Sequence, residues 1–283
     1  MTMLLNHKNR VPRLLLTSLL IAATAGGSAK AQSPPTGWVI YPMPESNSSV
    51  MQCANHSELE WQVSLSEAGT ARIVPHPTTH GAGSPKLPAG VKRQKGMIGV
   101  ESTFKLQNGW LLGFDAGEFG GGLWFAGGDG KTQELSNQNV HGFVETQQGV
   151  LVFVGLSHMF HDSGKVLIVP YKITSQTDLR TLVELDGAPE AVSKLSDDTA
   201  LVITTQGISQ ISSSGLTKTL LRRGFGGLYP NSIVPASDSA IYAGMRLFVV
   251  RLVPQSGEYT EQWLVPDDRK HFRVRDQQCV CKK

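Results

Sequence analysis

Charged side chains are scarce in this chain. Asp, Glu, Lys and Arg make up 17% of the residues and aromatic residues 7%, which fits a rigid scaffold whose specificity lies in its loops. After residue 31 no apolar run approaches the ~20 residues that a membrane-spanning helix needs, and no helical periodicity of useful length is present. Gly-x-Ser-x-Gly, HExxH and Walker sequences are also missing, so standard nucleophilic and phosphoryl-transfer chemistry has no visible support.

Cysteine is nearly absent too, with only Cys53, Cys279 and Cys281. An odd count allows one disulfide bond and one free thiol. Cys53 paired with Cys279 or Cys281 would join the two ends of the chain, and the alternative is a strained Cys279–Cys281 bridge. A single C-x-C pair is a weak signal for a metal site.

The first 31 residues have the pattern of a secretory signal peptide. Lys8, Arg10 and Arg13 precede an apolar run from Leu14 to Ala23, and Ala29-Lys30-Ala31 is a small-x-small cleavage site. We expect cleavage before Gln32 and a periplasmic or secreted protein; an uncleaved N-terminal anchor is the alternative.

Removal of this segment changes the charge balance. Residues 1–31 hold four of the 26 basic residues and no acidic residue, so residues 32–283 carry 22 basic against 23 acidic side chains. A net charge of −1 gives no indication of a nucleic-acid-binding surface. We expect neither a nucleic-acid partner nor a membrane span after residue 31.

A four-strand pattern repeats four times between residues 97 and 266, at intervals of 40 to 50 residues. In the first copy, the apolar segments Trp110–Phe114 and Gly122–Ala126 flank a glycine-rich turn. The predicted strands are 101–106, 110–114, 122–126 and 131–135; 141–146, 150–155, 165–171 and 180–185; 190–195, 200–205, 207–212 and 216–221; 231–235, 240–244, 246–253 and 259–265.

Four short strands per repeat of this length resemble the blade of a β-propeller. The resemblance is to blade architecture in general, because no WD or kelch signature is present. It implies an all-β fold, a single propeller domain over residues 32–283, with a β-sandwich as the alternative.

The number of blades depends on the weaker segments. Two strand-like runs, 59–65 and 70–74, suggest a fifth blade. A sixth could combine the segment 38–41 with residues 271–274 and 279–281. Residues 75–96 are rich in Pro, Gly and Lys and are expected to form a long loop or insert.

Register across the repeats places polar residues at the start of each innermost strand. Each lies eight positions before the residue that opens the second strand; they are Gln52, Glu101, His141, Glu190 and Asn231. Innermost strands of a propeller run beside the central axis, so these side chains are expected to form a ring at one face. The loops on that face carry Asp115, Glu118, His158 and His161.

Such a ring has three interpretations. It could line a water-filled channel, hold a polar ligand, or bind Ca²⁺ or another divalent cation through Glu101, Glu190, Asn231 and His141. The last resembles the axial metal site of six-bladed lactonase-type propellers, which implies a cation that polarises a carbonyl and activates water. His141 departs from that layout. His158-x-x-His161 in a turn is a poor zinc pattern.

Two functions follow from these interpretations. The first is a non-enzymatic binding module that holds a polar ligand or a protein partner, to which the loop residues Phe119 and Phe160 could also contribute. The alternative is a metal-dependent hydrolase of the lactonase or esterase type.

Overall fold

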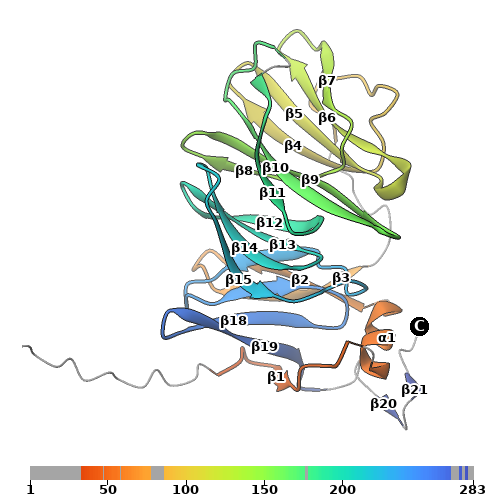
Figure 1. Cartoon of the computed structure of the whole chain (residues 1–283), viewed down its shortest axis with the longest axis vertical. Coiled ribbons are helices and arrows are strands. Elements are labelled where there is room, and N and C mark those ends of the chain that lie inside the picture. The colour runs from red at the N-terminus through yellow and green to blue at the C-terminus, as the bar shows by residue number, and fades with distance from the viewer. Residues whose placement is uncertain are drawn as a thin grey trace, which may run out of the picture. The chain divides into compact units, whose positions relative to one another are not determined.

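Antiparallel strands provide nearly all the regular structure of the chain (Figure 1). The computed structural model describes residues 33–46, 48–57, 59–77, 86–175, 178–268, 274–275 and 278–279. The chain divides into two units, residues 1–32 and residues 33–283. The predicted signal peptide, residues 1–31, lies outside the described residues.

In the part of the chain that the structure describes, four antiparallel sheets contain at least four strands and follow one another in sequence. The first consists of β4 (Val100–Leu106), β5 (Gly109–Asp115), β6 (Gly121–Gly127) and β7 (Thr132–Ser136). The second consists of β8 (Val140–Thr146), β9 (Gly149–His158), β10 (His161–Val169) and β11 (Arg180–Leu185). The third consists of β12 (Pro189–Ser196), β13 (Thr199–Thr204), β14 (Gly207–Ser212) and β15 (Thr217–Arg222). The fourth consists of β16 (Ser232–Pro235), β17 (Ile241–Gly244), β18 (Val249–Gln255) and β19 (Glu258–Pro266), with β1 (Trp38–Tyr41) added at its outer edge.

The first strands of these sheets lie side by side in chain order. β4 neighbours β8, β8 neighbours β12, β12 neighbours β16, and β16 neighbours β2 (Leu59–Leu65) of the hairpin β2–β3, whose second strand is Ala71–Pro77. Successive four-stranded meanders with adjacent inner strands are the blades of a propeller. The chain is an all-β propeller, as the repeats predicted.

Packing between blades explains why strand β9 is apolar on both faces. Val150, Val152 and Val154 belong to a core cluster that also includes side chains of the first sheet. Leu151 and Phe153, which point to the opposite face, join a cluster with the third sheet. Side chains alternate along a strand, so a sheet packed on both faces needs a continuous apolar run.

Glycine allows the closest approaches between neighbouring blades. A Cβ at Gly113 on β5 would lie 2.5 Å from Val140 Cγ1, at the start of β8. A Cβ at Gly244 on β17 would lie 2.3 Å from the carbonyl oxygen of Trp61 on β2. The inner strand of the next blade can pass at this distance only when no side chain is present.

The N-terminal strand corrects one expectation. β1 pairs antiparallel with β19, from Trp38↔Pro266 to Tyr41↔Trp263, whereas one of the two blade counts considered from the sequence placed it in a sixth blade with the C-terminal segment. β20 (Val274–Arg275) and β21 (Gln278–Cys279) pair with each other. The rings of Tyr41 and Phe248 lie 6.0 Å apart, so packing on the core of the fourth sheet accounts for the position of β1.

A short helix, α1 (Ser49–Asn55), was missed in the sequence. The side chain of Ser48 accepts a hydrogen bond from the Met51 N–H, as an N-cap residue does. Within the helix, the side chains of Cys53 and Ala54 are buried. Seven residues are too few for a helical period to be recognised. Among the described residues, no helix is long and apolar enough to cross a membrane.

The segment predicted as a loop over residues 75–96 is partly ordered against the fold. β3 continues to Pro77, so the expected start of the loop was wrong. Proline is tolerated in this strand because, among the described strands, β3 pairs only with β2 and so lies at a sheet edge. Residues 78–85 lie outside the described residues. Leu87 and Val91 pack on the outer face of the first sheet, against Leu112, Phe114 and Trp124.

Candidate functional site

The predicted ring residues lie at equivalent positions of the inner strands, with one correction. Glu101, His141 and Glu190 are the second residues of β4, β8 and β12, and Asn231 directly precedes β16. Gln52 is not at a strand start; it is an exposed residue of α1. The equivalent residue of the first hairpin is Glu60, the second residue of β2.

His141 and Glu190 also share a local backbone irregularity. On β8, Val140 pairs with Val154 and Gly142 with Phe153, which leaves His141 as an extra residue. On β12, Pro189 pairs with Thr204 and Ala191 with Ile203, which leaves Glu190 as an extra residue. Such β-bulges redirect a side chain and are frequent beside functional sites. At Glu101 the pairing with Phe114 is regular.

Glu101 holds the loop that precedes its own blade. Its carboxylate forms an ion pair with Arg93, and its side chain is only 2% exposed. Arg93 Nη1 also donates a hydrogen bond of 2.6 Å to the carbonyl of Met97, and its guanidinium lies 5.7 Å from the centre of the Phe114 ring. These contacts give Glu101 a structural partner within the protein.

Glu60 and Asn231 form a second polar cluster, between β2 and the fourth sheet. Arg246 Nε donates to Glu60 Oε1 over 3.1 Å, and Asn231 Nδ2 donates to Glu60 Oε2 over 3.5 Å. His76 Nδ1 lies 3.6 Å from the same oxygen. The Arg246 guanidinium is stacked on Tyr229, 3.8 Å from the ring centre. Two of the equivalent positions are thus engaged with each other.

His141 connects the first and second blades. Its Nδ1 lies 3.5 Å from Asp115 Oδ2, at the end of β5. Its Nε2 lies 3.1 Å from the carbonyl oxygen of Gly155, which can only accept, so Nε2 carries a hydrogen. Asp115 Oδ1 accepts from the N–H of Gly117 over 2.9 Å. The predicted meeting of Asp115 with His141 is therefore present.

Glu190 differs from the other ring residues in its lack of partners. Among the described residues, no group donates a hydrogen bond to its carboxyl. Burial raises the pKa of Glu190 to about 7, and the negative charges of Asp115 and Asp162 raise it further in the same direction. Among the ring residues, Glu190 is therefore the one whose carboxyl has no donor within the described part of the chain.

Asp162 has the opposite environment and fixes the junction of the second and third blades. Burial opposes its charge, but hydrogen bonds from the Ala188 N–H and from the side chains of Gln206, Thr205 and Ser157 outweigh burial and lower its pKa. The Gln206 amide lies 2.7 Å away and the Thr205 hydroxyl 2.8 Å away. Asp162 thus remains a fixed negative charge beside Glu190.

The remaining predicted residues lie at the edge of this cluster. His158 Nε2 and Glu118 Oε2 are 2.8 Å apart, and both side chains are exposed. His161 does not join them: its Nε2 lies 2.9 Å from the hydroxyl of Ser163. The structure thus pairs Asp115 with His141 and Glu118 with His158, and the charge of Asp115 acts on Glu190. His161 lies opposite His158 in the hairpin, but its ring contacts Ser163. The side chains of Glu101 and Asn231 are engaged with other groups, and Gln52 lies on α1.

Several contributors were not predicted as site residues. Glu60 could have been found, because it is the second residue of its strand as Glu101 and His141 are of theirs. Arg93, Thr205 and Gln206 carry no local signal, because their roles depend on contacts between segments. Among the described residues, no three His, Cys, Asp or Glu side chains are grouped as ligands for a metal ion.

Cys53 is disulfide-bonded. The other cysteines of the chain are Cys279 and Cys281, so its partner is one of these two. Helix α1 and strand β21 are neighbours in space, which agrees with this. The side chain of Cys279 and the whole of Cys281 lie outside the described residues.

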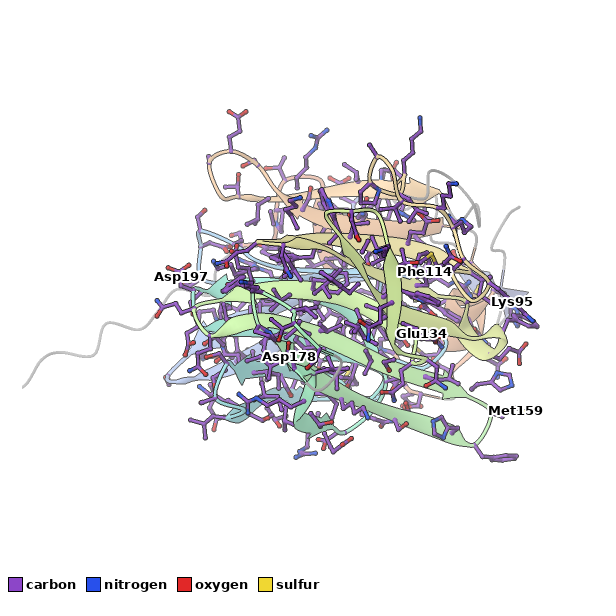
Figure 2. All side chains as sticks on the ribbon, turned by 90° about the horizontal axis from the view of Figure 1, so that it is seen from above. Lys95, Phe114, Glu134, Met159, Asp178 and Asp197 are labelled. Atoms are coloured by element: carbon purple, nitrogen blue, oxygen red, sulfur yellow. The ribbon has the colours of Figure 1, made fainter. Side chains whose placement is uncertain are left out.

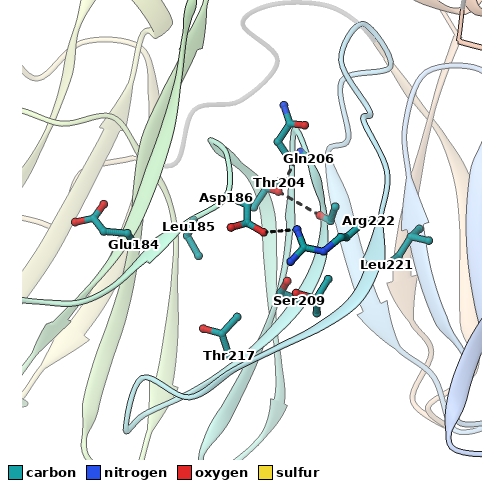
Figure 3. Close-up of a pocket in the computed structure, with 11 residues that line it drawn as sticks. Glu184, Leu185, Asp186, Thr204, Gln206, Ser209, Thr217, Leu221 and Arg222 are labelled. Atoms are coloured by element: carbon teal, nitrogen blue, oxygen red, sulfur yellow. Dashed lines mark hydrogen bonds and ion pairs between the residues drawn. The ribbon is translucent and has the colours of Figure 1, made fainter.

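A small pocket lies between the second and third sheets, and Glu190 is not among the residues that line it. It is lined by Glu184 and Asp186 on one side and by residues of β14 and β15 on the other, and Arg222 Nη1 lies 3.1 Å from Asp186 Oδ2 (Figure 3). Its volume of ≈ 30 Å³ has room for about two water molecules. It is too small for an organic ligand.

Comparisons with known proteins reveal only remote structural similarities. No protein-family model matches it, and no curated protein matches its sequence. Among solved structures, it is similar to a catalytically inactive virginiamycin B lyase from Staphylococcus aureus with quinupristin, with 13% identity, 79% of this chain and 73% of that chain covered, and a TM-score of 0.39.

Two further structures give the same picture. Regucalcin, a calcium-binding protein from Agrobacterium tumefaciens, is 11% identical with a TM-score of 0.40, over 72% of this chain and 74% of its own. A luciferin-regenerating enzyme is 8% identical with a TM-score of 0.42, and the match covers 76% of this chain and 79% of that enzyme. At these identities and TM-scores the similarities say nothing about what this chain binds.

Proposed function

We propose that this propeller is a binding module that holds a polar, positively charged group at Glu190, beside Asp115, His141 and Asp162. The observation that carries the proposal is the isolation of Glu190: it occupies a bulge at the start of an inner strand and has no hydrogen-bond partner among the described residues. Glu190 is partly exposed, and a carboxyl without a donor keeps its acceptor capacity, so a ligand that donates to it can take that role.

The charges around Glu190 favour a cation. Asp115 and Asp162 both oppose its ionisation. A cationic group placed among the three carboxyls would compensate their negative charge and so offset this repulsion. An anion would face the same repulsion as the Glu190 carboxylate itself.

The proposal can be tested with a minimal probe. n-Butylammonium chloride, titrated into the isotopically labelled protein, should shift NMR signals of Glu190 and of its neighbours Pro189 and Ala191 in a saturable way. Sodium chloride at equal ionic strength is the control. The shifts should be lost in Glu190→Gln and kept in Glu184→Gln, which alters a carboxyl away from this cluster. Equal responses in wild type and Glu190→Gln would contradict the proposal.

A hydrolase is a second candidate, favoured by one property of Glu190. A carboxyl with a pKa of about 7 is suited to general acid–base catalysis at neutral pH. The predicted metal would require Glu101 to leave Arg93, so metal binding by the ring stays a prediction. Turnover of ester or lactone substrates that is abolished by EDTA and by Glu190→Gln would establish this candidate; binding of the ammonium probe without turnover would reject it.

We also propose that the protein functions in the periplasm or outside the cell. The disulfide bond of Cys53 is of the kind that persists in oxidising compartments, and the first 31 residues have signal-peptide features. Sequencing the N-terminus of the exported protein should give Gln32 as the first residue. Recovery of a cytosolic chain that retains residues 1–31 would reject this location.

A further inference from the structure

The hairpin of β9 and β10 extends beyond its neighbouring strands. β8 pairs with β9 only up to Val154, and β11 pairs with β10 only from Gly164. The last three pairs of the hairpin, Leu156↔Ser163, Ser157↔Asp162 and His158↔His161, therefore have only each other as strand partners among the described residues. The tip projects from the second blade, with Met159 at its end (Figure 2).

The residues of this tip are unusual for a turn. Met159 has a positive φ of 53°, a conformation in which glycine or asparagine is normally found. Its side chain is 87% exposed, and that of Phe160 is fully exposed. Backbone strain together with exposed apolar side chains gives no benefit to folding, and strained residues of this kind cluster at functional sites.

A third exposed apolar side chain lies close to this tip. Phe119, 78% exposed, ends the short 3₁₀ helix η1 (Gly117–Phe119). The neighbouring residue Glu118 forms its ion pair with His158, directly before Met159 in sequence. We refer to Phe119, Met159 and Phe160 as the apolar rim.

Acidic residues are close to the apolar rim in the sequence. Glu118 adjoins Phe119, Asp115 lies four residues before it, and Asp162 lies two residues after Phe160. Asp115 and Asp162 also act on Glu190. The charge of Arg93 is matched by Glu101. The surface thus combines exposed apolar side chains with negative charge, which complements a basic and apolar partner and disfavours an anionic membrane surface.

We infer that the apolar rim is a docking surface for a partner polypeptide segment in which apolar side chains flank a lysine or arginine. The apolar residues of that segment cover Phe119, Met159 and Phe160, and its cationic side chain reaches the carboxyls of Glu190 and Asp115. The inference rests on the proposed function, because it identifies the cationic group held at Glu190 as part of a polypeptide.

A library of random peptides displayed on phage, selected on the folded chain from Gln32, tests this. Selected peptides should carry Lys or Arg between apolar residues. Their affinity should fall about tenfold or more when the three rim residues are all replaced by serine, since exposed aromatic anchors dominate such interfaces. Leu216→Ser, which removes an exposed apolar side chain from the turn before β15, should leave the affinity unchanged. Because all the replaced side chains are exposed, circular dichroism should show folded variants.

The outcomes separate this inference from the proposed function. Peptides that bind equally well to the triple-serine variant, but not to Glu190→Gln, overturn the docking surface and leave the proposed function standing. Peptides that bind equally to wild type and Glu190→Gln contradict the proposed function itself. Failure to select any peptide also overturns the inference, as does rim-dependent binding of phosphatidylglycerol vesicles or rim-dependent self-association in place of peptide binding.

Discussion

His141 and Glu190 occupy the same position in two successive blades, and each is the extra residue of a β-bulge. The bulges place an imidazole and a carboxyl at the inner-strand starts of the second and third blades. Asp115 faces His141 and acts on Glu190, so it links the two. This arrangement sets them apart from Glu101, which is regularly paired and held by Arg93.

Glu190 should make the protein less stable as the pH rises. Its pKa of about 7 in the folded chain lies above its ordinary value of 4.5, so the folded state binds more protons than the unfolded state between these values. The free energy of unfolding should therefore fall through this range, by about 3 kcal/mol in all. Chemical denaturation of wild type and Glu190→Gln across the same range measures this.

Relative to wild type, Glu190→Gln should become more stable towards pH 7, because glutamine carries no charge to be desolvated or repelled. Below pH 4.5 the two proteins should differ little. The same substitution at the exposed Glu258 is the control and should show no such dependence. A constant difference between Glu190→Gln and wild type would contradict the environment assigned to this carboxyl.

Arg93→Ala should lower stability by about 1–3 kcal/mol, the cost of leaving a buried acceptor unsatisfied. The substitution leaves the buried carboxylate of Glu101 without its counter-charge and releases the loop that Arg93 holds at Met97. Thermal and urea unfolding would measure the loss, and Arg93→Ala with Glu101→Gln should recover part of it. Lys131→Ala, which removes an exposed ion pair with Asp129, should cost less than about 1 kcal/mol. Equal losses for the two single variants would show that burial of Glu101 is unimportant.

Gly244→Ala should destabilise the contact between β17 and β2 by about 1–3 kcal/mol or more. The added methyl would lie 2.3 Å from the Trp61 carbonyl oxygen and 2.7 Å from the Ser232 hydroxyl, so backbone must move. Gly128→Ala is the matched control, because nothing lies within 4 Å of a Cβ there. A Gly244→Ala protein as stable as the control would contradict the close inter-blade packing.

The disulfide bond of Cys53 should contribute about 2–4 kcal/mol, because it closes a long loop between α1 and the C-terminal segment. Cys53→Ser should lose this amount in denaturation without reductant. Cys279→Ser and Cys281→Ser, made separately, should differ in stability. The variant that lacks the bonded cysteine should be as unstable as Cys53→Ser, and the other should be as stable as wild type. No loss in any of the three would mean that the bridge does not stabilise the fold.

The strands were predictable because their signals are local. β2 has the predicted bounds of Leu59–Leu65, and β5 and β6 differ from the prediction by one residue at each end. Alternating or continuous apolar runs between glycine-rich turns are sufficient to mark them. Helix α1 is too short to give a recognisable helical period. Because the helix was missed, Gln52 was assigned to a strand start and to the ring, where Glu60 is the equivalent residue.

The candidate site was only partly predictable. The shared register of Glu101, His141 and Glu190 marked the right position on three inner strands. Which of them is free depends on partners distant in sequence, such as Arg246, which is 186 residues from Glu60. The bulges at His141 and Glu190 depend on pairing with the next strand, and a sequence pattern does not report that pairing.

The most direct test of the account is the pKa of Glu190 itself, measured by ¹³C NMR of its side-chain carboxyl with and without n-butylammonium. We expect a pKa of about 7 in the free protein and a lower pKa with the probe bound, because a cation stabilises the ionised carboxyl. A value near the ordinary 4.5 in the free protein, or one that the probe leaves unchanged, would contradict the account.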